Sequence, residues 1–331
     1  MFVKTVIRRS KTMLRLRMLQ RYGFVLLLVG ILLVACGVEE EPAAEEGAAA
    51  ATIPPTTQPT EVPTAIPTAT PKPTATPVPT ATPEPTATVD PAELVSRLFD
   101  AAEAGNCAEV TALLAMGVDM NATDRTRATP LLIAARSGYT DIVVSLLDAG
   151  ADATLAAIGG YTPFLAAVWE GQVDVASLLI ERGADVNSRT GEGDTALMLA
   201  SRRGNLAMVE MLLENGADVS LQGTSGYMKT PLMEAAAGNH VEVGQMLLDY
   251  GADIQQGDVD GVPVLVYAAY WGHVEFTQML IDNGVDVNYY PPGVEEFTAL
   301  AYAIERHHPD VEALLRANGA VDVEIIIGNS E

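Results

Sequence analysis

Between residues 92 and 323 the apolar positions of the chain return at a nearly constant interval. One apolar segment opens with Thr and runs into small residues, as in "TPLLIAA" at Thr129 and "TPLMEAA" at Thr230. A second follows with a pair such as Leu146-Leu147, and a glycine closes the unit. These glycines are spaced by 33 or 35 residues: Gly117, Gly150, Gly183, Gly216, Gly251, Gly284 and Gly319. A fixed period of this length predicts an array of similar structural units.

Local signals predict helices inside each unit. A Thr hydroxyl can cap a helix, and the Pro that follows Thr129, Thr162 and Thr230 suits the first turn. Asp90-Pro91 makes the same kind of helix start before the first unit. The closing glycines can adopt the left-handed conformation that ends a helix. Small residues such as Ala134-Ala135 let neighbouring helices approach closely, while the Leu pairs fill the space between layers.

These units resemble the ankyrin repeat, which has a period of 33 residues and the signature T-P-L-H-x-A. The resemblance covers about seven units and implies that residues 90–331 form an all-α repeat solenoid, each unit a β-turn followed by two antiparallel helices. Pro263-Val264-Leu265 replaces T-P-L in the sixth unit, so the cap of that helix is in question. Residues 92–117 lack T-P-L, and we expect them to form an N-terminal cap of the stack.

The chain begins differently. Residues 1–21 carry basic residues and no acid, and residues 22–35 are almost wholly apolar. A membrane-spanning helix needs roughly 20 apolar residues, whereas the core of a signal peptide needs about 7–15. The run therefore favours a cleaved signal peptide. Met1, Met13 and Met18 are all candidate start residues.

Leu33-Val34-Ala35-Cys36 resembles the lipobox of bacterial lipoproteins. The resemblance implies that residues 1–35 are a lipoprotein signal peptide and that Cys36 is lipidated. The protein would then be lipid-anchored in the cell membrane or outer membrane, facing the periplasm or the cell exterior. Gly37 is not Asp, the residue that by the same resemblance signals retention in an inner membrane. The alternative is an ordinary signal peptide with a cysteine at this position by chance.

Two low-complexity segments follow the cysteine. Residues 36–51 are acidic and Ala-rich, and residues 52–89 consist mainly of Thr, Pro and Ala. Proline removes backbone donors and fixes φ, so this second segment favours a disordered, polyproline II-like linker. At ~3.1 Å per residue it could extend on the order of 100 Å. It is either a stalk, with its threonines as candidate glycosylation sites, or a passive linker.

Charge narrows the range of partners. The net charge is −24, and residues 90–331 contain 36 acidic against 11 basic residues. This excess argues against nucleic acid as a partner. Cys107 is the only cysteine besides Cys36. If Cys36 is lipidated, no intrachain disulfide forms, and we expect Cys107 to be a buried structural thiol.

The sequence shows no catalytic motif: it lacks HExxH, a P-loop, GxSxG and a CxxC pair. We therefore expect no enzymatic activity, no cofactor, no metal and no small-molecule substrate. His240 and His273 occupy turn positions of the repeat pattern and are predicted to make turn hydrogen bonds. His307-His308-Pro309-Asp310 falls in the equivalent turn, so we expect it to serve that turn and not to bind a metal. The aspartates after the closing glycines are expected to serve the same turns.

The ankyrin resemblance also implies a binding surface. In that family the two residues after the alanines of each first helix face a concave groove. Aromatic residues and Arg dominate binding hot spots, so the predicted partner-binding residues are Arg136, Trp169, Arg202, Arg203, Tyr270, Trp271 and Arg306. The tips of the hairpins between units would form a second contact strip. The alternative is that the tryptophans pack on neighbouring turns and the arginines are solvated or pair with hairpin acids.

We therefore expect a membrane-anchored, extracytoplasmic ankyrin-repeat protein that mediates protein–protein interaction through its groove and hairpin tips. The alternative is a structural or protective cell-envelope spacer without one specific partner.

Overall fold

The computed structural model describes residues 90–290 and 298–322, and within them the chain is helical. Two isolated β-bridges lie in hairpins there, Arg189 with Thr195 and Gly257 with Pro263. The predicted signal peptide (1–35), Cys36, the acidic segment (36–51) and the Thr/Pro-rich linker (52–89) lie outside the described residues. No helix among the described residues is long and apolar enough to cross a membrane.

Each of the seven units consists of a first and a second helix, which confirms the predicted all-α repeat architecture. The first helices are α2 (Pro91–Glu103), α4 (Pro130–Ser137), α6 (Pro163–Glu170), α8 (Ala196–Arg203), α10 (Pro231–Ala237), α12 (Val264–Trp271) and α14 (Ala299–Glu305). The second helices are α3 (Cys107–Ala115), α5 (Thr140–Asp148), α7 (Val173–Glu181), α9 (Leu206–Glu214), α11 (Val241–Asp249), α13 (Val274–Asp282) and α15 (Pro309–Ala317).

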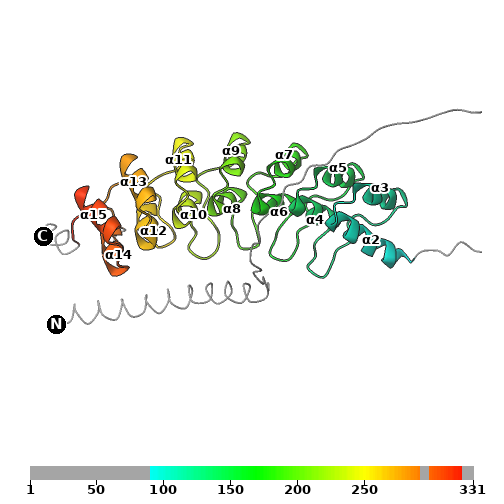
Figure 1. The fold of residues 1–331 in the computed structure, drawn as a ribbon, viewed down its shortest axis with the longest axis horizontal. Coiled ribbons are helices and arrows are strands. Elements are labelled where there is room, and N and C mark those ends of the chain that lie inside the picture. The colour runs from blue at the N-terminus through cyan, green and yellow to red at the C-terminus, as the bar shows by residue number, and fades with distance from the viewer. Residues whose placement is uncertain (1–89, 291–297, 323–331) are drawn as a thin grey trace, which may run out of the picture. The chain divides into compact units, whose positions relative to one another are not determined.

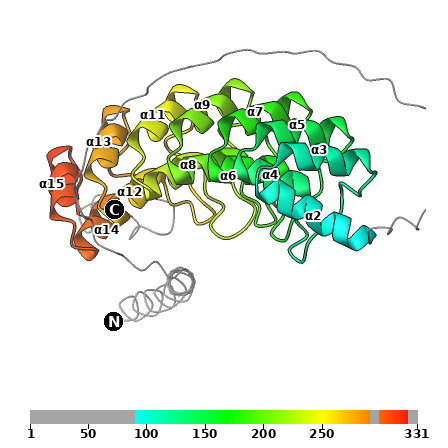
Figure 2. The same cartoon turned by 45° about the vertical axis from the view of Figure 1, so that its right-hand side comes forward.

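The units stack so that like helices pack together. Each first helix contacts the first helices of the adjoining repeats, and the second helices do the same in a row of their own. Figure 1 shows the two rows as the even-numbered and odd-numbered helices. The hairpins between repeats extend beyond the row of first helices (Figure 2). Residues one period apart in sequence therefore become side-by-side neighbours.

The predicted capping residues start the first helices. The hydroxyls of Thr129, Thr162 and Thr230 each accept a hydrogen bond of 3.2 Å from the backbone N–H three residues on. A capped N-terminus satisfies a backbone donor that would otherwise lack a helical partner. Pro263 makes no side-chain cap for α12, so the doubt raised by the sequence at this unit is confirmed.

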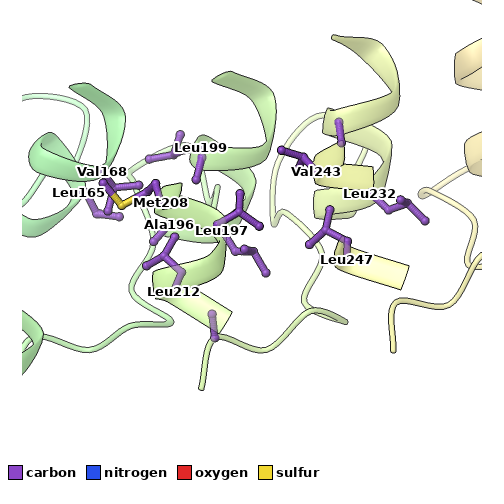
Figure 3. Close-up of a cluster of buried hydrophobic side chains, with 14 of the residues drawn as sticks. Leu165, Val168, Ala196, Leu197, Leu199, Met208, Leu212, Leu232, Val243 and Leu247 are labelled. Carbon is purple, nitrogen blue, oxygen red and sulfur yellow. The ribbon is translucent and has the colours of Figure 1, made fainter. Parts of the chain in front are cut away.

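One main hydrophobic core runs through the stack, and a smaller cluster forms around Leu132 and Ile133. One leucine of each predicted pair is fully buried: Leu146, Leu212 and Leu247 are 0 % exposed and Leu179 is 1 % exposed. Figure 3 shows Leu212 and Leu247 among apolar side chains of successive repeats. Alanines such as Ala134 and Ala135 are also fully buried. No repeat encloses its apolar face alone, so neighbouring repeats supply the rest of the core.

Side chains in the turns join successive repeats. The ring Nε2 atoms of His240, His273 and His308 lie 3.1, 3.2 and 3.1 Å from the carbonyl oxygens of Arg202, Ala237 and Tyr270 in the preceding repeat. The turn role predicted for His240 and His273 is confirmed, and His308 shares it. No group of three or more metal-binding side chains occurs among the described residues.

The aspartates after the closing glycines bond their own turns as expected. For example, Asp185 and Asp253 accept from the backbone N–H of Asn187 and Gln255 at 2.9 and 2.8 Å. Cys107 is an exception to prediction, because it is half-buried rather than buried. It is the first residue of α3, and its Sγ lies 3.8 Å from the Ser145 hydroxyl.

Candidate interaction face

The last turn of each first helix carries the predicted partner-binding residues. We call the surface that they form the first-helix face: the residues seven and eight positions after the capping residue of α4, α6, α8, α10, α12 and α14. Arg136, Arg203 and Arg306 are exposed there, while Trp169 and Tyr270 are half-buried. Trp271 is 46 % exposed, which is unusual for a tryptophan outside a binding surface. Because the first helices pack side by side, these residues lie on neighbouring elements.

One cluster on this face forms around Trp169. The guanidinium carbon of Arg203 lies 4.6 Å from the centre of the Trp169 ring, and Arg203 Nε donates to the Trp169 carbonyl at 3.1 Å. Arg203 also pairs with Glu170 at 3.5 Å. The ring of Tyr161 meets Trp169 edge-on at 6.4 Å. The tryptophan and the arginine are therefore held in place by contacts between repeats 3 and 4.

A second cluster forms around Tyr270. The guanidinium carbon of Arg306 lies 3.9 Å above the Tyr270 ring. Tyr270 meets Trp271 and Tyr302 edge-on at 5.1 and 5.7 Å. Stacked Arg–aromatic pairs keep apolar area and a fixed positive charge together, with little loss of side-chain entropy on binding. Both predicted tryptophans are thus parts of ordered Arg–aromatic clusters.

Arg202 has a different environment. It donates to Asp194 at 2.7 Å and to Glu234 at 2.9 and 3.1 Å, and Lys229 lies 3.4 Å from Glu234. Burial raises the pKa of Glu234, but the hydrogen bond from Arg202 and the charges of Lys229 and Arg202 outweigh it and hold that pKa below its ordinary value. Arg202 therefore links repeats 4 and 5 through carboxylates of the protein itself, while its side chain remains 37 % exposed.

Two buried acids, Glu234 and Asp258, were missed by the sequence analysis. Glu234 is only 4 % exposed, yet it occupies the helix position held by Ile133, Ala166 and Leu199 in other repeats. A single acid at a helix position that is apolar in the other repeats could have indicated a buried, paired carboxylate. Asp258 is similar, since it is 8 % exposed and accepts from the Tyr267 hydroxyl at 2.6 Å. Burial raises the pKa of Asp258 although the Tyr267 hydrogen bond opposes this.

The hairpin tips are connected to one another by hydrogen bonds. The backbone N–H groups of Ile158, Gly191 and Val259 donate to Thr126, Gly159 and Tyr227 in the preceding hairpin at 2.9, 2.6 and 2.9 Å. The Ser225 hydroxyl donates to the Glu192 carbonyl. Two of these tips expose apolar side chains, with Ile158 at 67 % and Val259 at 53 %. The last predicted tip, at residues 291–297, lies outside the described residues.

The sequence model of a family described as "Ankyrin repeats (3 copies)" matches residues 98–190, 187–258 and 255–326. Among solved structures, the chain is similar to the crystal structure of the human ASB11 ankyrin repeat domain. The two share 26% sequence identity and superpose with a TM-score of 0.60, over 68% of this chain and 98% of that one. No curated protein matches the sequence.

Proposed function

The chain belongs to the ankyrin repeat family, and we propose that it is a non-enzymatic protein that holds a protein partner on its first-helix face. Ankyrin repeats generally mediate protein–protein interaction, and nothing in the described residues points to catalysis. The observation that carries the proposal is the pair of Arg–aromatic clusters, with Trp271 46 % exposed beside Tyr270. Such side chains provide most of the binding energy at many interfaces.

A photo-reactive amino acid in place of Trp271 tests this proposal on intact cells. We expect cross-linking to one or a few defined proteins. Tyr250 offers a matched control, because it is 48 % exposed and lies at the end of α11 in the row of second helices. The same photo-reactive residue at position 250 should leave those products unformed.

Truncation of the side chain adds an energetic test. Trp271→Ala should weaken the binding free energy of the cross-linked partner by about 2 kcal/mol, the size of a hot-spot effect. Tyr250→Ala should leave the affinity unchanged. Equal losses at both positions would contradict the assignment to the first-helix face. Many faint products that fade with added salt would instead support the spacer function, because weak association with an acidic surface is screened by ions.

We also propose that the protein is lipid-anchored through Cys36 and displays its repeats outside the cytoplasm. Support for this comes from the sequence, where an apolar run of signal-peptide length ends in Leu33-Val34-Ala35-Cys36 and is followed by a Thr/Pro-rich segment. In this proposal, residues 52–89 act as the stalk between the anchor and the repeats. The partner would then be a protein of the cell envelope or the cell exterior.

A further inference from the structure

Repeats 2 and 4 each place an arginine at the same position of the first-helix face. Arg136 and Arg202 both lie seven residues after the capping threonine, which is Thr129 in one repeat and Thr195 in the other. The surroundings of Arg202 in repeat 4 can therefore be compared directly with those of Arg136 in repeat 2.

In repeat 4 the arginine receives two carboxylates from the protein itself. One comes from Asp194, the residue immediately before the capping threonine, at 2.7 Å. The other comes from Glu234, four residues after the capping threonine of the next repeat, at 2.9 Å. These two positions are thus the sources of negative charge for an arginine at this place.

In repeat 2 both of those positions hold alanine. Ala128 precedes Thr129, and Ala166 lies four residues after Thr162; they are 4 % and 5 % exposed. Arg136 is exposed and makes no ion pair with any described residue. Glu170, in the last turn of α6, pairs with Arg203 at 3.5 Å.

The nearby hairpin has a carboxylate, Asp124, that interacts electrostatically with Arg136 but forms no ion pair with it. Asp124 Oδ1 accepts hydrogen bonds from the Thr126 N–H, the Thr126 hydroxyl and the Ala128 N–H. Burial raises the pKa of Asp124, but these bonds and the charge of Arg136 hold it below its ordinary value. The Asp124 carboxylate is therefore attracted by the Arg136 charge, but its Oδ1 atom is occupied by hydrogen bonds within the hairpin.

Unpaired positive charge is concentrated at this place in an otherwise acidic domain. Of the 11 arginines and lysines among the described residues, eight have a carboxylate, a carbonyl or an aromatic ring as a partner. The exceptions are Arg125 and Arg127, which are exposed in the hairpin before α4, and Arg136 in α4. All three thus belong to the same repeat.

We infer that Arg136 is an open anion site of the first-helix face, which receives a carboxylate from an extended segment of the protein partner. This inference rests on the proposed function and specifies the chemistry of its partner. An arginine can hold a carboxylate through two parallel hydrogen bonds. Trp169 lies one repeat away, which is about 8–10 Å for packed helices. An extended chain rises ~3.3 Å per residue, so the acid lies about three residues from an apolar side chain that contacts Trp169.

A random library of 12-residue peptides displayed on phage, selected on the purified full chain, tests the inference. We expect enriched peptides to share an Asp or Glu about three residues from an aromatic or aliphatic residue. Arg136→Gln should weaken these peptides at least about tenfold, equivalent to roughly 1.4 kcal/mol. Selection on Arg136→Glu should replace the shared acid with Lys or Arg. Enriched peptides without an acid, or an unchanged affinity for Arg136→Gln, would overturn the inference.

Two further variants separate this inference from its premise. Ala128→Asp with Ala166→Glu supplies Arg136 with the carboxylates that Arg202 has, and should weaken the same peptides at least about tenfold. The far-ultraviolet circular dichroism should remain unchanged; if it does not, Arg136→Gln decides alone. Arg182→Gln is the control, because Arg182 lies at the end of α7 in the row of second helices and forms only a surface ion pair with Asp148; it should retain peptide binding. If no peptide is enriched, the proposed function itself is contradicted for peptide partners, whereas enriched peptides that bind Arg136→Gln unchanged contradict only the inference.

Discussion

Glu234 illustrates how much one residue can change between repeats. At the same helix position, Ile133, Ala166 and Leu199 contribute apolar contacts, whereas Glu234 places a carboxylate at a site that is 4 % exposed. A buried charge is costly unless it is paired and hydrogen-bonded. Arg202 and Lys229 supply that pairing from repeats 4 and 5. Glu234 is therefore the common partner of both cations, and its removal leaves Lys229 without an ion pair and Arg202 with Asp194 alone.

Glu234→Gln should lower the free energy of unfolding by on the order of 2 kcal/mol, because the buried amide leaves Lys229 without its ion pair and Arg202 with Asp194 alone. Glu170→Gln is the matched control, since its ion pair with Arg203 has both side chains more than a third exposed. It should cost less than about 1 kcal/mol. Urea unfolding at pH 7 measures the free energy of unfolding of both variants. Similar losses in Glu234→Gln and Glu170→Gln would contradict an essential role for the buried Glu234 ion pairs.

The ion pair between Glu234 and Arg202 also predicts that the stability of the protein depends on pH. The pKa of Glu234 in the folded protein lies below its ordinary value of 4.5. A carboxyl group with a lowered folded pKa contributes stability above its unfolded pKa and loses it as the pH falls through the folded pKa. The free-energy difference between the wild type and Glu234→Gln should therefore shrink as the pH drops below about 4.5. A difference that stays constant down to pH 3 would contradict the charge pairing.

Helix boundaries are set by short-range signals, which is why the sequence predicts them well. The hydroxyl of Thr129 bonds a backbone group only three residues away, and Gly150 closes its unit with a positive φ of 97°. Arg202 depends instead on contacts 8 and 32 residues away in the chain. Its ion pairs depend on packing between repeats, so the sequence could predict Arg202 as a residue of the binding face but not its contacts with Asp194 and Glu234.

Thr129→Val tests the cap directly, because it keeps the shape of the side chain and removes the acceptor for the Leu132 N–H. We expect a loss of about 1 kcal/mol in the free energy of unfolding, the usual effect of a lost N-cap. Thr140→Val is the control. Thr140 is the first residue of α5, and its hydroxyl makes no hydrogen bond among the described residues. Thermal unfolding followed by circular dichroism should show no shift for Thr140→Val, and equal shifts would refute the capping role.

At the scale of the whole molecule, stacking and charge set where binding can occur. Each repeat gains its core from its neighbours, so one face of every first helix is committed to packing and the last turn is left to vary. Both tryptophans of the chain lie in that last turn, on repeats 3 and 6. The net charge of −24 repels other acidic surfaces at long range. The exposed arginines of the first-helix face and its hairpins therefore stand out as local sites of opposite sign.

The proposed anchor can be tested because the chain has only two cysteines, Cys36 and Cys107. In bacteria fed a clickable palmitate analogue, Cys36→Ser should abolish labelling of the protein and release it from the membrane fraction. Cys107→Ser should leave both unchanged, since Cys107 is half-buried at the start of α3. Two or three acyl chains bind a bilayer firmly, whereas a protein without them has only weak surface contacts. Labelling that persists in Cys36→Ser would refute lipidation at this residue and, with it, the role of residues 52–89 as a stalk from the membrane.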